Sequence, residues 1–159
     1  MYKIEIITKN GFDCNWSTLL VGRQFNLISA LEITNYAVKY LESNPNANNE
    51  LILELAWEQE EVKVDNILES ITSDSSSEDM KREYHKWLYS TMKETYINSS
   101  DEEIFEEIEN IFSIFNTPEN MYDFFRKVSD AFYYPHDSKN TIKELVEEFL
   151  ETEKKLIFK

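Results

Sequence analysis

Apolar residues that recur at intervals of three and four positions predict amphipathic helices over most of the chain beyond residue 14. The stretch after Ser29 is typical, because Ile33, Ala37, Tyr40 and Leu41 lie along one face of a helix. This pattern predicts seven or eight helices, which begin near Asn15, Ser29, Asn49, Asp65, Ser77, Ser100, Thr117 and Asn140.

Side chains that accept backbone N–H groups mark several of these starts. Ser29 followed by Glu32, and Ser100 followed by Glu103, match the capping-box pattern. Thr117-Pro118 supplies a cap and then a proline at the first helical position, where the missing N–H is harmless. We therefore expect an all-α fold in which consecutive helices pack as antiparallel neighbours, with a solenoid-like stack of helix pairs as the alternative.

The first eight residues follow a different pattern. Tyr2, Ile4 and Ile6 alternate with Lys3 and Glu5, which favours a short strand or an extended arm over Met1 to Thr8. The chain has 159 residues, the usual length of one domain, so residues 1–159 are predicted to form a single helical domain. The serine-rich run at 72–77 is interpreted as a mobile connector within it.

Composition supports the helical interpretation and suggests a compartment. Two glycines and three prolines are too few for a β-rich sandwich or a phosphate-binding loop. The single cysteine, Cys14, permits no intrachain disulfide, and no run approaches the ~18 apolar residues of a membrane span. Met1 to Thr8 is too polar for a signal peptide, so we expect a cytoplasmic protein.

Negative charge is concentrated in two stretches. Thirty-one acidic residues against sixteen basic ones give a net charge of -15. Glu42 to Asp79 holds eleven acidic residues and one base, Lys63, and Glu94 to Phe125 holds no base. Such surfaces repel nucleic acids and anionic membranes, because binding to phosphates needs Lys and Arg. A basic protein is the partner that this charge favours.

The sequence contains few of the residue patterns that are typical of metal sites or catalytic nucleophiles. Neither His85 nor His136 has a carboxylate or histidine at the spacing of a helical metal site, so no metal or other cofactor is expected. A cysteine nucleophile would be Cys14, with His85 or His136 as its base. A small buried side chain is the interpretation of Cys14 that we favour.

One loop keeps an alternative function open. Tyr133, Tyr134, His136 and Asp137 surround Pro135, and an aromatic loop with a histidine and a carboxylate can form the pocket of a small enzyme or ligand-binding domain. Aromatic side chains that pin the loop over the core are the interpretation that we favour. A third hypothesis is a structural protein whose apolar patch is buried by self-association.

The leading hypothesis is a non-enzymatic binding protein that docks on a basic protein, such as a toxin, and blocks its active site. Trp57 lies among carboxylates, which is the composition of a protein-binding hot spot. The predicted contact residues are Glu54, Trp57, Glu58, Glu60 and Glu61, with Glu102, Glu103, Glu106 and Glu107 as the second candidate set.

Several segments carry a resemblance to a known family. They are Asn15-Trp16, Leu27-Ile28-Ser29, Tyr40-Leu41-Glu42-x-Asn44-Pro45, Glu50-x-Ile52-x-Glu54-Leu55-Ala56-Trp57 and Phe115-Asn116-x-Pro118-Glu119-x-Met121. In these segments, and over nearly its whole length, the chain resembles a bacterial family of unknown function, number 2247 among such domains. The resemblance implies a small bacterial cytosolic domain of the type often encoded as an immunity protein beside a secreted toxin. It implies no catalytic residue.

Overall fold

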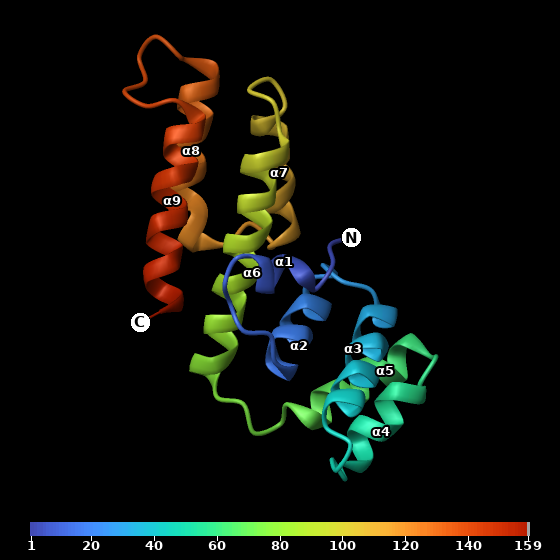
Figure 1. Ribbon diagram of the computed structural model, residues 1–159. Coiled ribbons are helices and arrows are strands. Elements are labelled where there is room, and N and C mark those ends of the chain that lie inside the picture. Colours follow the sequence, from blue (N-terminus) through green and yellow to red (C-terminus); the bar gives the residue numbers. More distant parts are fainter. Residues whose placement is uncertain (159) are drawn as a thin grey trace. The chain divides into compact units, whose positions relative to one another are not determined.

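The computed structural model describes residues 1–158, and helices joined by short turns account for most of them (Figure 1). This confirms the all-α prediction, with no strand among these residues. The described elements are α1 (Glu5–Lys9), α2 (Trp16–Gln24), α3 (Ala30–Ser43), α4 (Glu50–Trp57), α5 (Glu61–Ile71), α6 (Ser77–Asn98), α7 (Ile104–Ile114), the 3-10 turn η1 (Glu119–Met121), α8 (Tyr122–Tyr133) and α9 (Ile142–Ile157).

The predicted N-terminal strand is wrong, because the chain turns into α1 at Glu5. No second strand is present among residues 1–158 to pair with it, and a lone strand leaves its backbone groups unpaired. The alternation does describe burial, since Tyr2, Ile4 and Ile6 are half-buried. The helical turn then brings Ile7 fully into the core, while the N–H of Tyr2 donates to the carbonyl of Leu27.

Several predicted helix starts are capped as the sequence indicates. The side chain of Asn15 accepts the N–H of Thr18, and Thr141 forms a capping box with Glu144. The Ser29 hydroxyl accepts the N–H of Glu32 at 3.3 Å. The Glu32 carboxylate accepts the N–H of Ile4 at 3.4 Å, so it links α3 to the N-terminal segment.

Three predicted starts differ from the structure. α5 begins at Glu61 rather than near Asp65, and α7 begins at Ile104 rather than near Ser100. α6 does begin at Ser77, and Ser76 before it exchanges two hydrogen bonds of 3.1 Å with Asp79. Pro118 precedes a 3-10 turn and not the first turn of an α-helix. Asn116 and Thr117 have φ of 60° and 48°, so the chain is still in left-handed backbone just before the proline.

The backbone packing divides the chain into two compact units, Met1–Tyr84 and His85–Lys159, with the boundary inside α6. Within unit 1, α3 packs on α4, and α5 packs on α2, α3 and α4. The serine-rich run lies in this unit, where the hydroxyls of Ser75 and Ser17 are 2.6 Å apart. That the serine-rich run is mobile, and that the chain forms a single domain, stay predictions. The unit 1 core includes Leu19, Ile33, Leu55 and Leu68.

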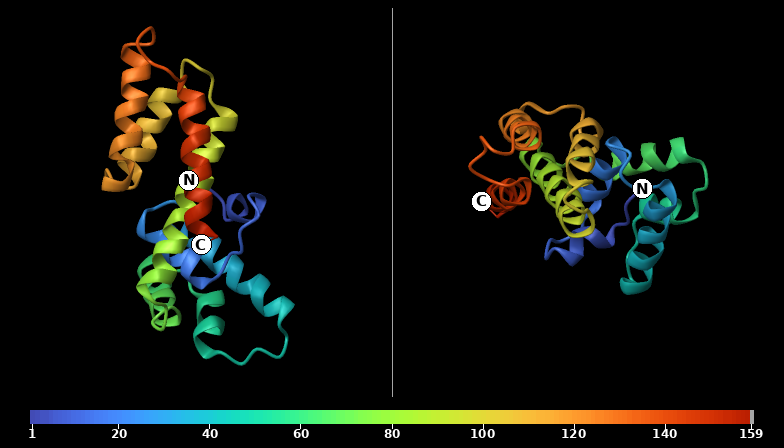
Figure 2. Two further views of the ribbon diagram at one scale, coloured as in Figure 1. Left: turned by 90° about the vertical axis from the view of Figure 1, so that its left-hand side faces the viewer. Right: turned by 90° about the horizontal axis from the view of Figure 1, so that it is seen from above.

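Unit 2 is built from the rest of α6 together with α7, α8 and α9. α8 packs on both α7 and α9, and these helices lie side by side in Figures 1 and 2. Trp87 and Leu88 of α6 are fully buried, as are Ile108 of α7, Val128 of α8 and Val146 of α9. Each helix of this unit therefore supplies apolar side chains to one core.

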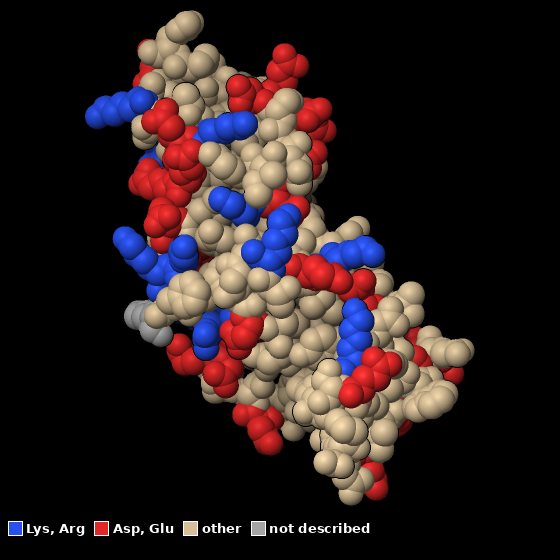
Figure 3. All heavy atoms as spheres, in the orientation of Figure 1, with Lys and Arg blue, Asp and Glu red and all other residues tan. Residues whose placement is uncertain are grey.

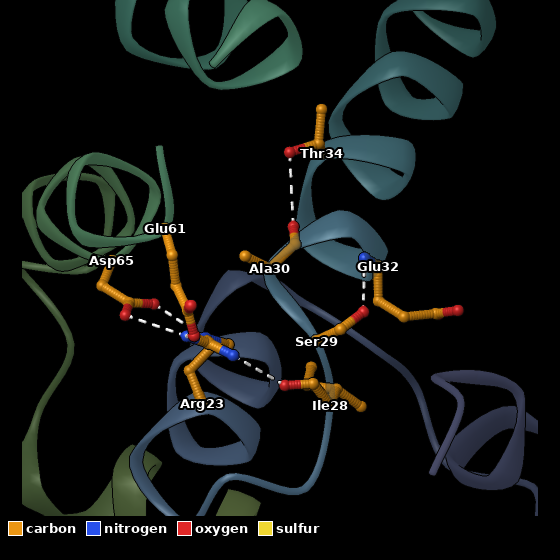
Figure 4. A network of polar contacts seen from close by, with 8 residues as sticks. All are labelled: Arg23, Ile28, Ser29, Ala30, Glu32, Thr34, Glu61 and Asp65. Atoms are coloured by element: carbon orange, nitrogen blue, oxygen red, sulfur yellow. Dashed lines mark hydrogen bonds and ion pairs between the residues drawn. The ribbon is translucent and has the colours of Figure 1, made fainter. Parts of the chain in front are cut away.

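A buried guanidinium joins three segments of unit 1 (Figure 4). Arg23 of α2 donates to both carboxylate oxygens of Asp65 at 2.8 and 3.0 Å, to Glu61 at 2.6 Å and to the carbonyl of Ile28 at 2.9 Å. The hydrogen bonds that Arg23 donates to Asp65, and then the one that it donates to Glu61, raise the pKa of Arg23 above its usual range. An unpaired charge at this buried position would be costly. The hydrogen bonds of Arg23 therefore fix α5 and the 25–29 turn against α2.

We expect Asp65→Ala to lower the free energy of unfolding by about 2 kcal/mol, because it leaves a buried guanidinium with only part of its pairing. Urea denaturation followed by circular dichroism measures this change. Asp74→Ala removes the same charge from an exposed position and should change the free energy by less than about 0.5 kcal/mol. Equal effects of the two substitutions would contradict the role assigned to Arg23.

Candidate functional site

Helix α4 has more apolar residues than unit 1 buries. Six of the eight residues of Glu50–Trp57 are apolar, and Ile52 and Leu55 are the two that the core covers. Leu53 and Trp57, one turn apart on the same face, are exposed. Trp57 is 83% exposed, which is unusual for the largest apolar side chain. This face of α4 therefore has the character of a surface that another molecule covers.

A shallow hollow of about 400 Å³ lies beside Trp57. Val38, Leu41 and Glu42 of α3 line one side, and Ala56 and Trp57 of α4 line the other. Its wall is apolar apart from the carboxylate of Glu42. A pocket of this size and lining accepts an apolar side chain, with the carboxylate placed at its margin.

Three of the predicted contact residues gather next to this helix end. Glu60 lies 3.1 Å from the ammonium group of Lys63, and this hydrogen bond, with the nearby charges of Glu58 and Glu54, raises the pKa of Lys63. One carboxylate oxygen of Glu58 accepts the N–H groups of Gln59 and Glu60, which lowers the pKa of Glu58. The structure thus brings Glu54, Glu58 and Glu60 together around a single base.

Glu61, the fifth predicted contact residue, also pairs with a basic side chain of unit 1. Its carboxylate lies 2.6 Å from Arg23, which sequence reasoning did not select. Part of its charge is therefore compensated within the fold, although its side chain stays exposed at the surface. We call Trp57, Glu54, Glu58, Glu60 and the hollow beside Trp57 the α4 site.

The second predicted set lies in unit 2, around the start of α7. Glu102, Glu103, Glu106 and Glu107 are all exposed. Glu103 exchanges hydrogen bonds with the backbone N–H and hydroxyl of Ser100, as the capping pattern predicts, although α7 itself begins at Ile104. Glu106 and Glu107 are successive residues of α7, so they point about 100° apart around the helix axis.

The candidate catalytic groups of the sequence differ in their exposure. His85 is buried, with Nδ1 2.6 Å from the carboxylate of Glu153, whereas His136 is exposed in the loop after α8. Cys14 is half-buried in unit 1, and its carbonyl accepts the hydroxyl of Tyr36. Over residues 1–158, no three His, Cys, Asp or Glu side chains come together as metal ligands.

The aromatic loop lies beside a hollow of about 460 Å³ in unit 2, lined by Pro135, the 138–141 segment and the first turn of α9. The four side chains proposed for a pocket do not line it. Tyr133, Tyr134, His136 and Asp137 are instead exposed. They therefore do not converge as an acid, a base and an aromatic wall around one cavity.

Acidic and basic side chains are interspersed on the face drawn in Figure 3, and uncharged atoms cover much of the area formed by α3 and α4. The net charge is therefore not a single continuous patch on this face. No helix within residues 1–158 is both long and apolar enough to cross a membrane.

Comparison with known proteins identifies the family. A family model described as "Uncharacterized protein conserved in bacteria (DUF2247)" matches residues 4–154. The chain belongs to this family. The resemblance that the capping and core segments carry is thereby confirmed, and DUF2247 membership covers both compact units. No curated protein and no solved structure matches the chain.

The exposure of Trp57 and the charges near it have a spectroscopic consequence. We expect Cs⁺ to quench tryptophan fluorescence about twofold more efficiently than iodide, each relative to free N-acetyltryptophanamide, because carboxylates concentrate the cation there. Trp87 is fully buried and Trp16 is half-buried, so Trp57→Phe should abolish the difference. High salt should also abolish it. Equal relative quenching in the unsubstituted protein would contradict a negative field at Trp57.

Proposed function

We propose that this DUF2247 protein is a non-enzymatic binding protein that docks on a basic protein through the α4 site. The observation that carries the proposal is the exposed Trp57 beside an apolar hollow. Burying an aromatic side chain of this size in a partner is a typical source of binding energy, and tryptophan is enriched at such positions.

The charges at the rim support a basic partner. Glu54, Glu58 and Glu60 leave a net negative charge around Lys63, and Glu42 adds a carboxylate at the hollow. Carboxylates at the edge of an apolar contact attract Lys and Arg, which accelerates association and selects against acidic partners. The α4 site therefore combines an apolar anchor with electrostatic selection.

We further propose that the partner is a toxin and that binding occludes its active site, so that the protein acts as a cytoplasmic immunity protein. Membership in a bacterial family is compatible with this role, and the resemblance discussed above suggests it. The probe is the C-terminal domain of a secreted protein encoded beside this gene. Co-expression should restore growth of cells that produce the domain, and the purified proteins should form a complex.

Trp57→Ala should weaken this complex about 30-fold, equivalent to about 2 kcal/mol, because it removes the anchor. Isothermal titration calorimetry measures the dissociation constant. Leu156→Ala truncates another exposed apolar residue, in unit 2, and should leave the dissociation constant within about twofold. A complex that is insensitive to Trp57→Ala would place the contact elsewhere and reject the α4 site.

Reversal of the rim charges should act on the rate of association. The triple variant Glu42→Lys, Glu54→Lys, Glu60→Lys should slow association about tenfold at low salt and reduce its salt dependence. The matched control is Glu69→Lys, Asp74→Lys, Glu78→Lys, which changes the net charge equally at exposed positions of the same unit. Equal slowing by the two variants in stopped-flow measurements would assign the effect to net charge and not to the α4 site.

A further inference from the structure

An unbroken series of aromatic rings follows the junction of α7 and α8 in unit 2. Its centroid separations are 6.1, 4.5, 6.2, 4.2 and 5.0 Å, with face-to-face stacking in three of the five pairs and edge-on contact in the two terminal ones. Both helices contribute, and they lie side by side in Figures 1 and 2. In order, the rings of this aromatic ladder belong to Tyr122, Phe112, Phe125, Phe105, Phe132 and Tyr133.

The ladder is open to solvent along most of its length. Tyr122, Phe132 and Tyr133 are 54%, 42% and 64% exposed, and Phe112 and Phe125 are half-buried. Phe105 alone among the six is buried. The core of unit 2 is filled by other side chains of the same helices, such as Ile108 and Val128. The exposed rings are thus surplus to the core, which is typical of an interaction surface.

Carboxylates border the ladder on the α7 side. Glu109 lies one helical turn from both Phe105 and Phe112, and Glu106 follows Phe105 directly. Both glutamates are exposed, and within residues 1–158 neither forms an ion pair with a basic side chain. On the α8 side, Arg126 lies 2.8 Å from Asp123, so this base is already paired. The uncompensated charge next to the rings is therefore negative.

Exposed aromatic rings beside carboxylates favour one type of side chain. A guanidinium stacks flat on an aromatic ring and at the same time donates to a carboxylate, whereas an ammonium group is compact and more strongly hydrated. We propose that the aromatic ladder binds an arginine-bearing segment of a protein partner, with guanidinium groups stacked on its exposed rings and their N–H groups directed to Glu106 and Glu109. This surface belongs to unit 2 and shares no residue with the α4 site.

The test uses the full-length protein and three twelve-residue peptides in which glycine alternates with arginine, lysine or citrulline. Citrulline keeps the planar shape without the charge, and lysine keeps the charge without the plane. We expect the arginine peptide to bind about fivefold more tightly than the lysine peptide and the citrulline peptide to bind weakest. Amide shifts in NMR titrations should map to residues 105–133. Equal affinity for arginine and lysine, or shifts confined to other segments, would overturn the proposal.

Variants of exposed residues separate the ladder from general acidity. Tyr122→Ala with Tyr133→Ala, and independently Glu106→Gln with Glu109→Gln, should each weaken binding of the arginine peptide about tenfold. The matched controls are Tyr134→Ala, an exposed tyrosine outside the ladder, and Glu148→Gln with Glu151→Gln on α9. Circular dichroism verifies the fold of each variant. Equal losses in the controls would overturn the proposal.

Two further outcomes are informative. Sedimentation velocity that detects a dimer, which Tyr133→Ala dissociates, would identify a second copy of the chain as the occupant and would overturn the arginine proposal. Because these variants leave Trp57 unchanged, failure of the arginine-peptide test does not affect the proposal for the α4 site. Conversely, a toxin complex that is insensitive to Trp57→Ala rejects the α4 site and leaves the peptide result intact.

Discussion

The pairing of one buried guanidinium governs the arrangement of unit 1. Arg23 projects from an apolar helix, where an unpaired charge would oppose folding. Glu61 and Asp65 lie one turn apart on α5, so their carboxylates reach it together, and the Ile28 carbonyl accepts a further hydrogen bond. The pairing therefore holds α5 against α2.

Both proposed surfaces combine surplus apolar area with uncompensated carboxylates. In unit 1 the surplus is Trp57 and its neighbours on α4, and in unit 2 it is the aromatic ladder between α7 and α8. In each unit other side chains of the same helices are buried, while these rings remain at the surface. Apolar contact supplies affinity and charge supplies selectivity, which is the division of labour expected of a protein-binding domain.

Local signals predicted the helices better than the site. Asn15 and Ser29 cap helices as their sequence context indicates, because a cap involves residues only three positions apart. The strand over Met1 to Thr8 was wrong, since its alternation is as compatible with a half-buried helix start as with a strand. Glu61 was selected as a contact residue for its charge alone. A lone arginine within an apolar helix and two acids four residues apart were the available signals for its pairing.

The sequence by itself determined the all-α class, the caps and the excess of negative charge, because composition and spacing over a few residues are sufficient for each. Tertiary structure decided which acids remain available and which aromatic rings stay outside. Glu61 meets Arg23, and Phe105 of α7 stacks on Phe132 of α8, through contacts between residues far apart in the chain. Spacing along one helix carries no information about such partners, since they depend on how separate helices pack.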